Sequence, residues 1–284
     1  MSLKHLSLLL CSLVLGLTMT ACGAVQPGQT AGAEPLELPE TLVSQVLLDQ
    51  ASSGYMEGEC AAEGHIILDT VQEEDFWQVY TLASVGQYGF CSGHFEMISG
   101  SGAIPTRITI GRDENGNYYC HGVWEPEDGS YYADSIKETF PRKLWGKAMN
   151  GHERYGELKE QKEAYAQAYL ESMGREAPVG DHGDFEHPLF TENGMSVEVS
   201  NALIAIEKLY PFPMHIGNEE RIEDGVRYVY ETAWAHEGNG VGTATYTKYE
   251  YDTNQVIQRY VFLVEGDTYT EAQPQGPGMN APVP

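Results

Sequence analysis

The side chains best suited to metal chemistry lie in one Gly-rich stretch, Asp181-His182-Gly183-Asp184-Phe185-Glu186-His187. Two imidazoles with a carboxylate can bind zinc, so His182, Asp184 and His187 are the candidate metal ligands. Their spacing matches no established zinc motif, and glycine at this density is typical of a polar linker. The linker interpretation is favoured, and the sequence predicts no metal and no other cofactor.

A second candidate is a cysteine nucleophile with a base nearby. Cys91 and His94 are the residue types that this chemistry needs, but the intervening Ser-Gly favours a loop between strands. The sequence contains no H-E-x-x-H zinc motif, no G-x-S-x-G elbow, no P-loop and no S-x-x-K. We therefore assign no catalytic residue and expect a protein that is not an enzyme.

Aromatic residues suggest a ligand groove. Trp124, Tyr131 and Tyr132 flank the acidic pair Glu127-Asp128, and exposed aromatic side chains often line ligand sites. Packing in a hydrophobic core is the competing interpretation, and it is favoured.

Three cysteines remain beyond the N-terminal region: Cys60, Cys91 and Cys120. An odd number allows one disulfide at most. If 58–70 and 77–91 form a hairpin, Cys60 falls nearly opposite Cys91, which makes this pair the disulfide candidate. The alternative is three small apolar side chains in a reducing niche.

The N-terminus predicts export. Lys4 and His5 precede an apolar run from Leu6 to Leu17, and Met19-Thr20-Ala21 leads to Cys22. This order is typical of a signal peptide over 1–21 with a lipobox, so we expect Cys22 to carry diacylglycerol. The run is shorter than the roughly 20 residues that span a bilayer. We expect a lipoprotein on the outer face of the cytoplasmic membrane.

The charge is strongly negative, with 16 Lys and Arg against 42 Asp and Glu, a net charge of −26. Such a field repels phosphate backbones, so nucleic acid is not an expected partner. The acids are dispersed, which favours a solvated surface.

Hydrophobic periodicity predicts an α+β fold of antiparallel meanders packed against helices. Alternation in 77–85, 105–110, 117–124 and 226–235 indicates strands, and Asn115-Gly116 predicts a hairpin. The clearest helix is 152–173, with Glu and Lys on its polar face. The expected organisation is a signal peptide (1–21), a tether (22–38), an α+β domain (39–174), a linker (175–194), a second α+β unit (195–272) and a disordered tail (273–284).

One segment resembles a known family. Residues 124–132, WEPEDGSYY, and 135–141, SIKETFP, are similar to a segment of the extracytoplasmic region attached to BlaR1/MecR1-type membrane metallopeptidases (peptidase family M56) of gut Firmicutes. The resemblance covers about 38–172. It implies a Gram-positive host and a stand-alone, lipid-tethered version of a sensory or binding domain, and it supplies no catalytic residue.

The sequence therefore predicts a non-catalytic binding, sensory or accessory lipoprotein, in envelope-stress or peptidoglycan signalling. Two alternatives stay open. One is an envelope hydrolase with a non-standard carboxylate site, and the other is an inhibitor or partner-binding protein that presents a sheet face.

Overall fold

The computed structural model describes residues 40–73, 76–188, 196–238 and 240–272. The expected signal peptide, Cys22 with its lipid, the tether and the expected tail lie outside the described residues. By their contacts, the described residues belong to one compact unit. Within the described ranges, no helix has the length and apolarity that a membrane crossing requires.

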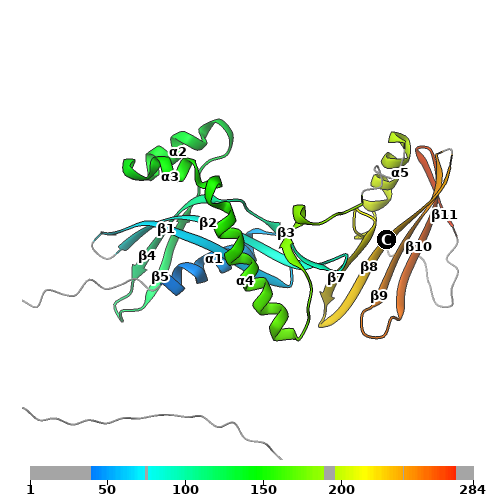
Figure 1. The fold of residues 1–284 in the computed structure, drawn as a ribbon, viewed down its shortest axis with the longest axis horizontal. Helices are drawn as coiled ribbons and strands as arrows, with labels where there is room; N and C mark the ends of the chain where they lie inside the picture. Colours follow the sequence, from blue (N-terminus) through cyan, green and yellow to red (C-terminus); the bar gives the residue numbers. More distant parts are fainter. Residues whose placement is uncertain (1–39, 74–75, 189–195, 239, 273–284) are drawn as a thin grey trace, which may run out of the picture. The chain divides into compact units, whose positions relative to one another are not determined.

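The chain has the α+β fold that its periodicity predicts: an eleven-stranded sheet with five helices packed against it in the described residues (Figure 1). The strands are β1 (Cys60–Glu73), β2 (Phe76–Cys91), β3 (His94–Gly100), β4 (Ile104–Arg112), β5 (Tyr118–Trp124), β6 (Val179–Asp181), β7 (Gly217–Glu223), β8 (Val226–Gly238), β9 (Val241–Glu250), β10 (Val256–Glu265) and β11 (Thr268–Ala272). The helices are α1 (Glu40–Gly54), α2 (Tyr132–Thr139), α3 (Trp145–Met149), α4 (Tyr155–Met173) and α5 (Val197–Glu207).

The sheet runs in the order β11-β10-β9-β8-β7-β2-β3-β6, and β1 and β4 join it through β2. Neighbouring strands are antiparallel except for the pair of β3 with β6. The junction between β7 and β2 is a single residue pair, Cys91 with Glu219. Two groups of strands therefore meet at the end of β2.

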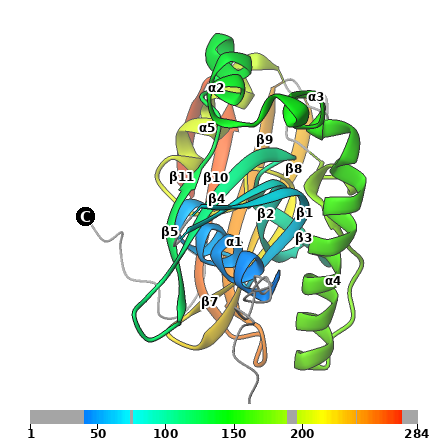
Figure 2. The ribbon, with the colours of Figure 1, turned by 90° about the vertical axis from the view of Figure 1, so that its left-hand side faces the viewer.

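Strand β2 is the most enclosed element. It pairs along one edge with β1 and along the other with β4 and then β3, and helices α1 and α4 pack on it (Figure 2). Every residue from Val79 to Cys91 is buried. The thiol of its last residue, Cys91, therefore lies in the interior.

The predicted hairpin is confirmed. Strands β4 and β5 pair on either side of the turn, where Gly116 has a φ of +87°. The Asp113 carboxylate accepts hydrogen bonds from the backbone N–H groups of Asn115 and Asn117. The left-handed turn and this acceptor explain why the Asp-Glu-Asn-Gly sequence reverses the chain here.

The long helix is also confirmed as α4, which ends at Gly174 with a left-handed φ of +66°. Its polar face differs from the prediction. The buried stripe contains Lys162, whose side chain is 0 % exposed, beside Leu158, Ala166 and Leu170. A lysine was expected to face solvent because composition alone does not show which side of a mixed helix meets the sheet.

The Lys162 ammonium lies among polar partners. Its Nζ is 3.2 Å from the Tyr155 hydroxyl, 3.1 Å from Met97 Sδ and 3.8 Å from Asp181 Oδ1. Burial lowers the pKa of Lys162, against the opposing charge of Asp181. The group ties α4 to β6, which lies inside the segment expected as a linker. That part of the linker is structured because β6 pairs with β3.

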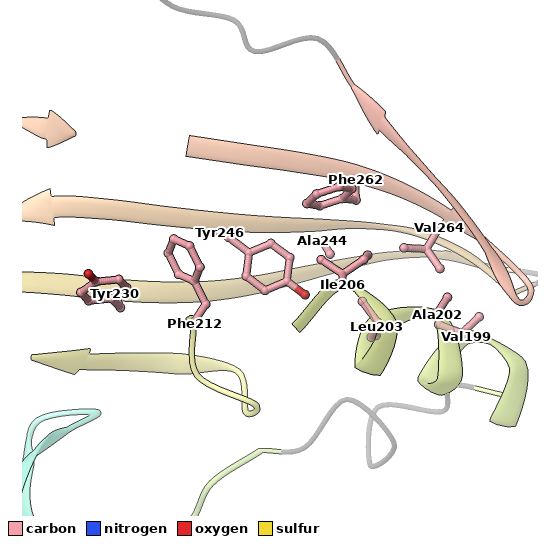
Figure 3. Packing of buried hydrophobic residues seen from close by; sticks show 10 residues of the cluster. All are labelled: Val199, Ala202, Leu203, Ile206, Phe212, Tyr230, Ala244, Tyr246, Phe262 and Val264. Carbon is pink, nitrogen blue, oxygen red and sulfur yellow. The ribbon is translucent and has the colours of Figure 1, made fainter. Parts of the chain in front are cut away.

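The C-terminal strands have their own hydrophobic core (Figure 3). Helix α5 supplies Leu203 and Ile206, and Phe212 packs between Tyr230 and Tyr246 with ring centroids 5.3 and 5.4 Å apart. The residues predicted to alternate along β8 include Tyr228, Tyr230, Thr232 and Trp234. The two tyrosines and the tryptophan do face this core.

One carboxyl group at the edge of this core is poorly solvated. Glu207 ends α5, and no described residue forms a hydrogen bond with its Oε1. Burial raises the pKa of Glu207 to about 7. Its position at a helix C-terminus also disfavours a negative charge.

We predict that Glu207→Gln stabilises the protein at pH 8. A folded-state pKa above the unfolded value of about 4.3 means that stability is lost as pH rises from about 4 through 7. After allowance for solvent screening, the gain is about 1 kcal/mol at pH 8 and is smaller at pH 5. Urea unfolding at both pH values measures it, with exposed Glu265→Gln as the control. An equal effect at both pH values would contradict the assignment.

Candidate metal centre

Three segments distant in sequence bring metal-binding atoms together at the end of β2. Cys91 Sγ lies 3.3 Å from His215 Nε2 and 3.8 Å from His187 Nδ1. The three donor atoms all lie within 4.8 Å of one another. We call Cys91, His187 and His215 the inner triad. Cys91 and His215 are buried, and the His187 side chain is 7 % exposed.

The spacing of the inner triad fits a tetrahedral metal ion. Zinc binds thiolate at about 2.3 Å and imidazole at about 2.0–2.1 Å, which places sulfur and nitrogen about 3.5 Å apart at a tetrahedral angle. The two sulfur–nitrogen distances, 3.3 and 3.8 Å, lie on either side of that value. A thiolate with two imidazoles suits zinc and related transition metals better than magnesium or calcium.

A tight turn sets the direction of Cys91. Ser92 and Gly93 have φ values of +49° and +84°, which is the pattern of a two-residue hairpin turn. In the resulting pairing of β2 with β3, Cys91 stands opposite His94, and Gly89 stands opposite Glu96. Side chains of paired residues share a face, so Cys91 and Glu96 point the same way.

Helix α4 and strand β6 position the two histidines that the sequence singled out. The Tyr155 hydroxyl donates to Asp181 Oδ2 at 2.7 Å, and Lys159 Nζ donates to Asp184 Oδ2 at 2.5 Å. Asp184 also accepts a hydrogen bond from the backbone N–H of Asp181. The candidate ligand Asp184 is not part of either group of donors that the fold brings together, and its carboxylate closes the turn that carries His182 and His187.

The loop before β7 places His215. The backbone N–H of Ile216 donates to the Pro188 carbonyl at 2.8 Å, next to His187. The backbone N–H of Ser92 donates to the Asn218 carbonyl at 2.8 Å. A Cβ at Gly217 would lie 2.3 Å from Ser92 Oγ, so only glycine permits this approach. Backbone contacts thus bring all three segments to the same point.

A second set of donors adjoins the inner triad. Glu96 Oε1 lies 2.8 Å from His182 Nδ1, and Glu96 Oε2 lies 3.1 Å from His187 Nε2. The rings of His182 and His187 stack with centroids 3.9 Å apart and planes 6° apart. Glu96, His182 and His187 also form a group that could hold a metal ion. We call them the outer triad.

The electrostatics keep Cys91 and His215 neutral without a metal. Burial raises the pKa of the Cys91 thiol, and the Glu96 charge adds to this. Burial lowers the pKa of His215, which leaves the imidazole neutral at neutral pH. A divalent cation would replace the thiol proton and take up the imidazole lone pairs. Such an ion would compensate the burial of these polar groups.

The inner triad opens onto a cleft of about 680 Å³. Cys91, His215, Glu96 and His182 form part of its wall. The lining also includes apolar side chains, further glutamates and one arginine: Met56, Phe90, Ile98, Ile222, Glu57, Glu59, Glu219, Glu220, Glu223 and Arg221. Three protein donors leave one tetrahedral position for a further ligand.

The other sequence candidates separate in space. Cys60 pairs with Tyr88 in the register of β1 with β2, and both Cys60 and Cys91 are free thiols. The disulfide prediction is wrong because Cys91 is three residues further along β2, on its opposite face, beyond disulfide reach. His94 is the cross-strand neighbour of Cys91, but its ring stacks on Phe185 at 4.1 Å. The Cys91 thiol contacts His187 and His215 instead.

Two of the three aromatic residues suggested for a ligand groove pack in the core, as the favoured interpretation expects. Trp124 and Tyr132 pack against a buried cluster that includes Ile136 and Phe140. Tyr131 alone is largely exposed. Core packing, the competing interpretation, accounts for the first two side chains because α2 lays its apolar face on the sheet here.

Comparisons with protein-family models, curated proteins and solved structures found no match to this chain. The resemblance of residues 38–172 to the extracytoplasmic region of M56-type sensors stays a prediction. The chemistry of the centre therefore rests on its own side chains. Sequence patterns marked His182 and His187, but His215 lies in a loop with no recognisable motif.

A partly buried charge network holds the second half of the chain beside the centre. Arg227 contacts Glu59 at 2.5 and 2.8 Å and Glu220 at 2.8 Å. Arg175 forms a two-pronged pair with Glu220 at 2.7 and 2.9 Å and lies 3.5 Å from the Phe90 ring centroid. Glu59 lines the cleft next to β2, whereas Glu220 belongs to β7.

We predict that Arg227→Met destabilises the protein by about 2–4 kcal/mol, because it leaves the Glu59 and Glu220 carboxylates buried without their partner. Chemical unfolding at neutral pH measures the loss. Arg259→Met, at an exposed arginine of β10, is the matched control. A loss no larger than that of the control would show that the network does not secure the junction.

Proposed function

We propose that the protein is a transition-metal-binding protein of the cell envelope and that its inner triad binds Zn²⁺. The observation that carries this proposal is the convergence of one thiol and two imidazoles from three distant segments at metal-ligand distances. A chance surface group would not combine burial, soft donors and matched geometry.

The surroundings support the proposal. Glu96 Oε2 and His187 Nε2 lie 3.1 Å apart, yet neither has a hydrogen-bond partner among the described residues. Buried polar atoms are normally paired. Two ligands of one metal ion lie next to each other around it without forming a hydrogen bond. The close but misaligned approach of these two atoms is therefore the arrangement that a shared ion would produce.

The cellular role follows from the sequence. The signal peptide and Cys22 predict a lipid anchor on the outer face of the cytoplasmic membrane, and the absence of catalytic motifs favours a binding, sensory or accessory role. The resemblance to an M56-associated sensory region agrees with signalling. We propose that this module binds the metal ion and that the occupancy of its metal centre is the signal it reports.

An envelope hydrolase is the second candidate, and one observation favours it. Three protein ligands with an open position beside a cleft is the arrangement of catalytic rather than structural zinc. Release of products from peptidoglycan fragments by the zinc-loaded protein, lost in His215→Ala, would favour the hydrolase. If the His215→Ala variant kept the activity, or if the wild-type protein showed none, the binding role would remain.

We predict that the mature protein binds one Zn²⁺ tightly in competition with a chromophoric chelator. Cys91→Ala and His215→Ala each remove one of three ligands, so the affinity falls about 100-fold or more. Cys120→Ser, at an exposed thiol outside the centre, is the control and keeps wild-type affinity. Zinc at 100 times its Kd should also raise the unfolding free energy by about 2.7 kcal/mol. Equal binding by Cys91→Ala would refute the proposed centre.

A further inference from the structure

The inner and outer triads share one imidazole through its two nitrogens. His187 presents Nδ1 to Cys91 at 3.8 Å and Nε2 to Glu96 at 3.1 Å. The two donor sets are therefore separated by the width of a single ring. Such an arrangement allows an ion to bind on either side of His187.

Exposure singles out one donor of the outer triad. The His182 side chain is 60 % exposed, whereas Glu96 is 1 % and Cys91 is 2 % exposed. Of these donors, His182 is therefore the most accessible to an ion that arrives from solvent, while Cys91 and His215 border the same cleft. The buried Glu96 carboxylate lies next to His182, with its Oε1 2.8 Å from His182 Nδ1.

The charge of the cleft favours the approach of a cation. Six glutamates line the cleft that His182 also borders, against one arginine in the lining, Arg221, and the whole chain carries a net charge of −26. Clefts in which one sign of charge predominates raise the local concentration and the association rate of ions of the opposite sign. A cation drawn into the cleft thus meets His182 and Glu96 of the outer triad.

We propose that Glu96, His182 and His187 form a second metal site, which captures the incoming ion and passes it to the inner triad. The inference rests on the proposed function. A carboxylate with two imidazoles binds zinc less tightly than a set that includes a thiolate, so transfer runs downhill. The ion stays divalent throughout. The His187 ligand atom changes from Nε2 to Nδ1 while the ring proton moves from Nδ1 to Nε2, and the Cys91 thiol releases its proton to solvent.

The test is stopped-flow mixing of the metal-free mature protein with Co²⁺, followed by the sulfur-to-cobalt charge-transfer absorption of Cys91. His182→Ala should reach the wild-type final amplitude with an association rate lower by about tenfold. His152→Ala, at an exposed histidine before α4, is the matched control and keeps the wild-type rate. Titration with excess Co²⁺ should show a second, weaker binding step without charge-transfer absorption, and His182→Ala should lose it.

Two results would overturn the capture site while leaving the inner centre intact. One is an unchanged association rate in His182→Ala. The other is loss of the charge-transfer amplitude in that variant, which would make His182 a ligand of the final site. Absence of the absorption in the wild-type protein would instead refute the proposed function, and the capture site with it.

Discussion

The structure depends on how strand β2 satisfies its backbone. Sixteen consecutive residues must find hydrogen-bond partners on both edges, because buried peptide groups cannot remain unpaired. Strand β1 covers one edge as far as Tyr88 and ends there at Cys60. The last residues, Gly89 to Cys91, would then have an open edge, and β7 reaches it only at Cys91. The cleft lies along this gap, so the thiol is buried yet faces an open space.

The scarcity of basic residues makes the position of each one consequential. Only 16 lysines and arginines accompany 42 acids, yet Lys162, Arg175 and Arg227 are placed away from full solvent exposure. Each meets carboxylates that the fold also buries. Removing one partner from such a set lowers the stability of the fold by more than the intact set contributes to it, because the remaining charge stays desolvated. The net negative surface is therefore compatible with a junction held by a few cations.

Local signals predicted the elements with local causes. The Asn-Gly turn, the helix ending at Gly174 and the alternation of β8 depend on residues near one another in the chain, and all three were predicted. Strand β6 was missed because three residues become a strand only when β3 lies beside them. Strand β7 was missed because its sequence, Gly-Asn-Glu-Glu-Arg-Ile-Glu, has no apolar alternation and uses ion pairs instead.

The site shows the same limit more strongly. His182 and His187 could be marked because their spacing is short, but Asp184 could not be separated from them, since its role in closing the turn depends on Lys159 of α4. Cys91 and His215 are 124 residues apart, and no sequence pattern relates them. Their meeting is a consequence of the β2–β7 junction, which itself depends on where β1 ends.

The same separation gives the proposed metal a structural consequence. Cys91 is 96 residues from His187 and 124 from His215, so an ion bound to all three closes one loop of 96 residues and a second, between the histidines, of 124 − 96 = 28 residues. In the unfolded chain such a cross-link removes conformational freedom in the way that a disulfide does, by about 4–5 kcal/mol for the longer loop if strain is small. Cys60, Cys91 and Cys120 form no disulfide with one another. If the N-terminal sequence directs export as predicted, the metal centre would provide the long-range cross-link that disulfides usually supply outside the cell. Because the ion is exchangeable, the stability of the β2–β7 junction would follow metal availability, which is the property a metal-reporting module requires.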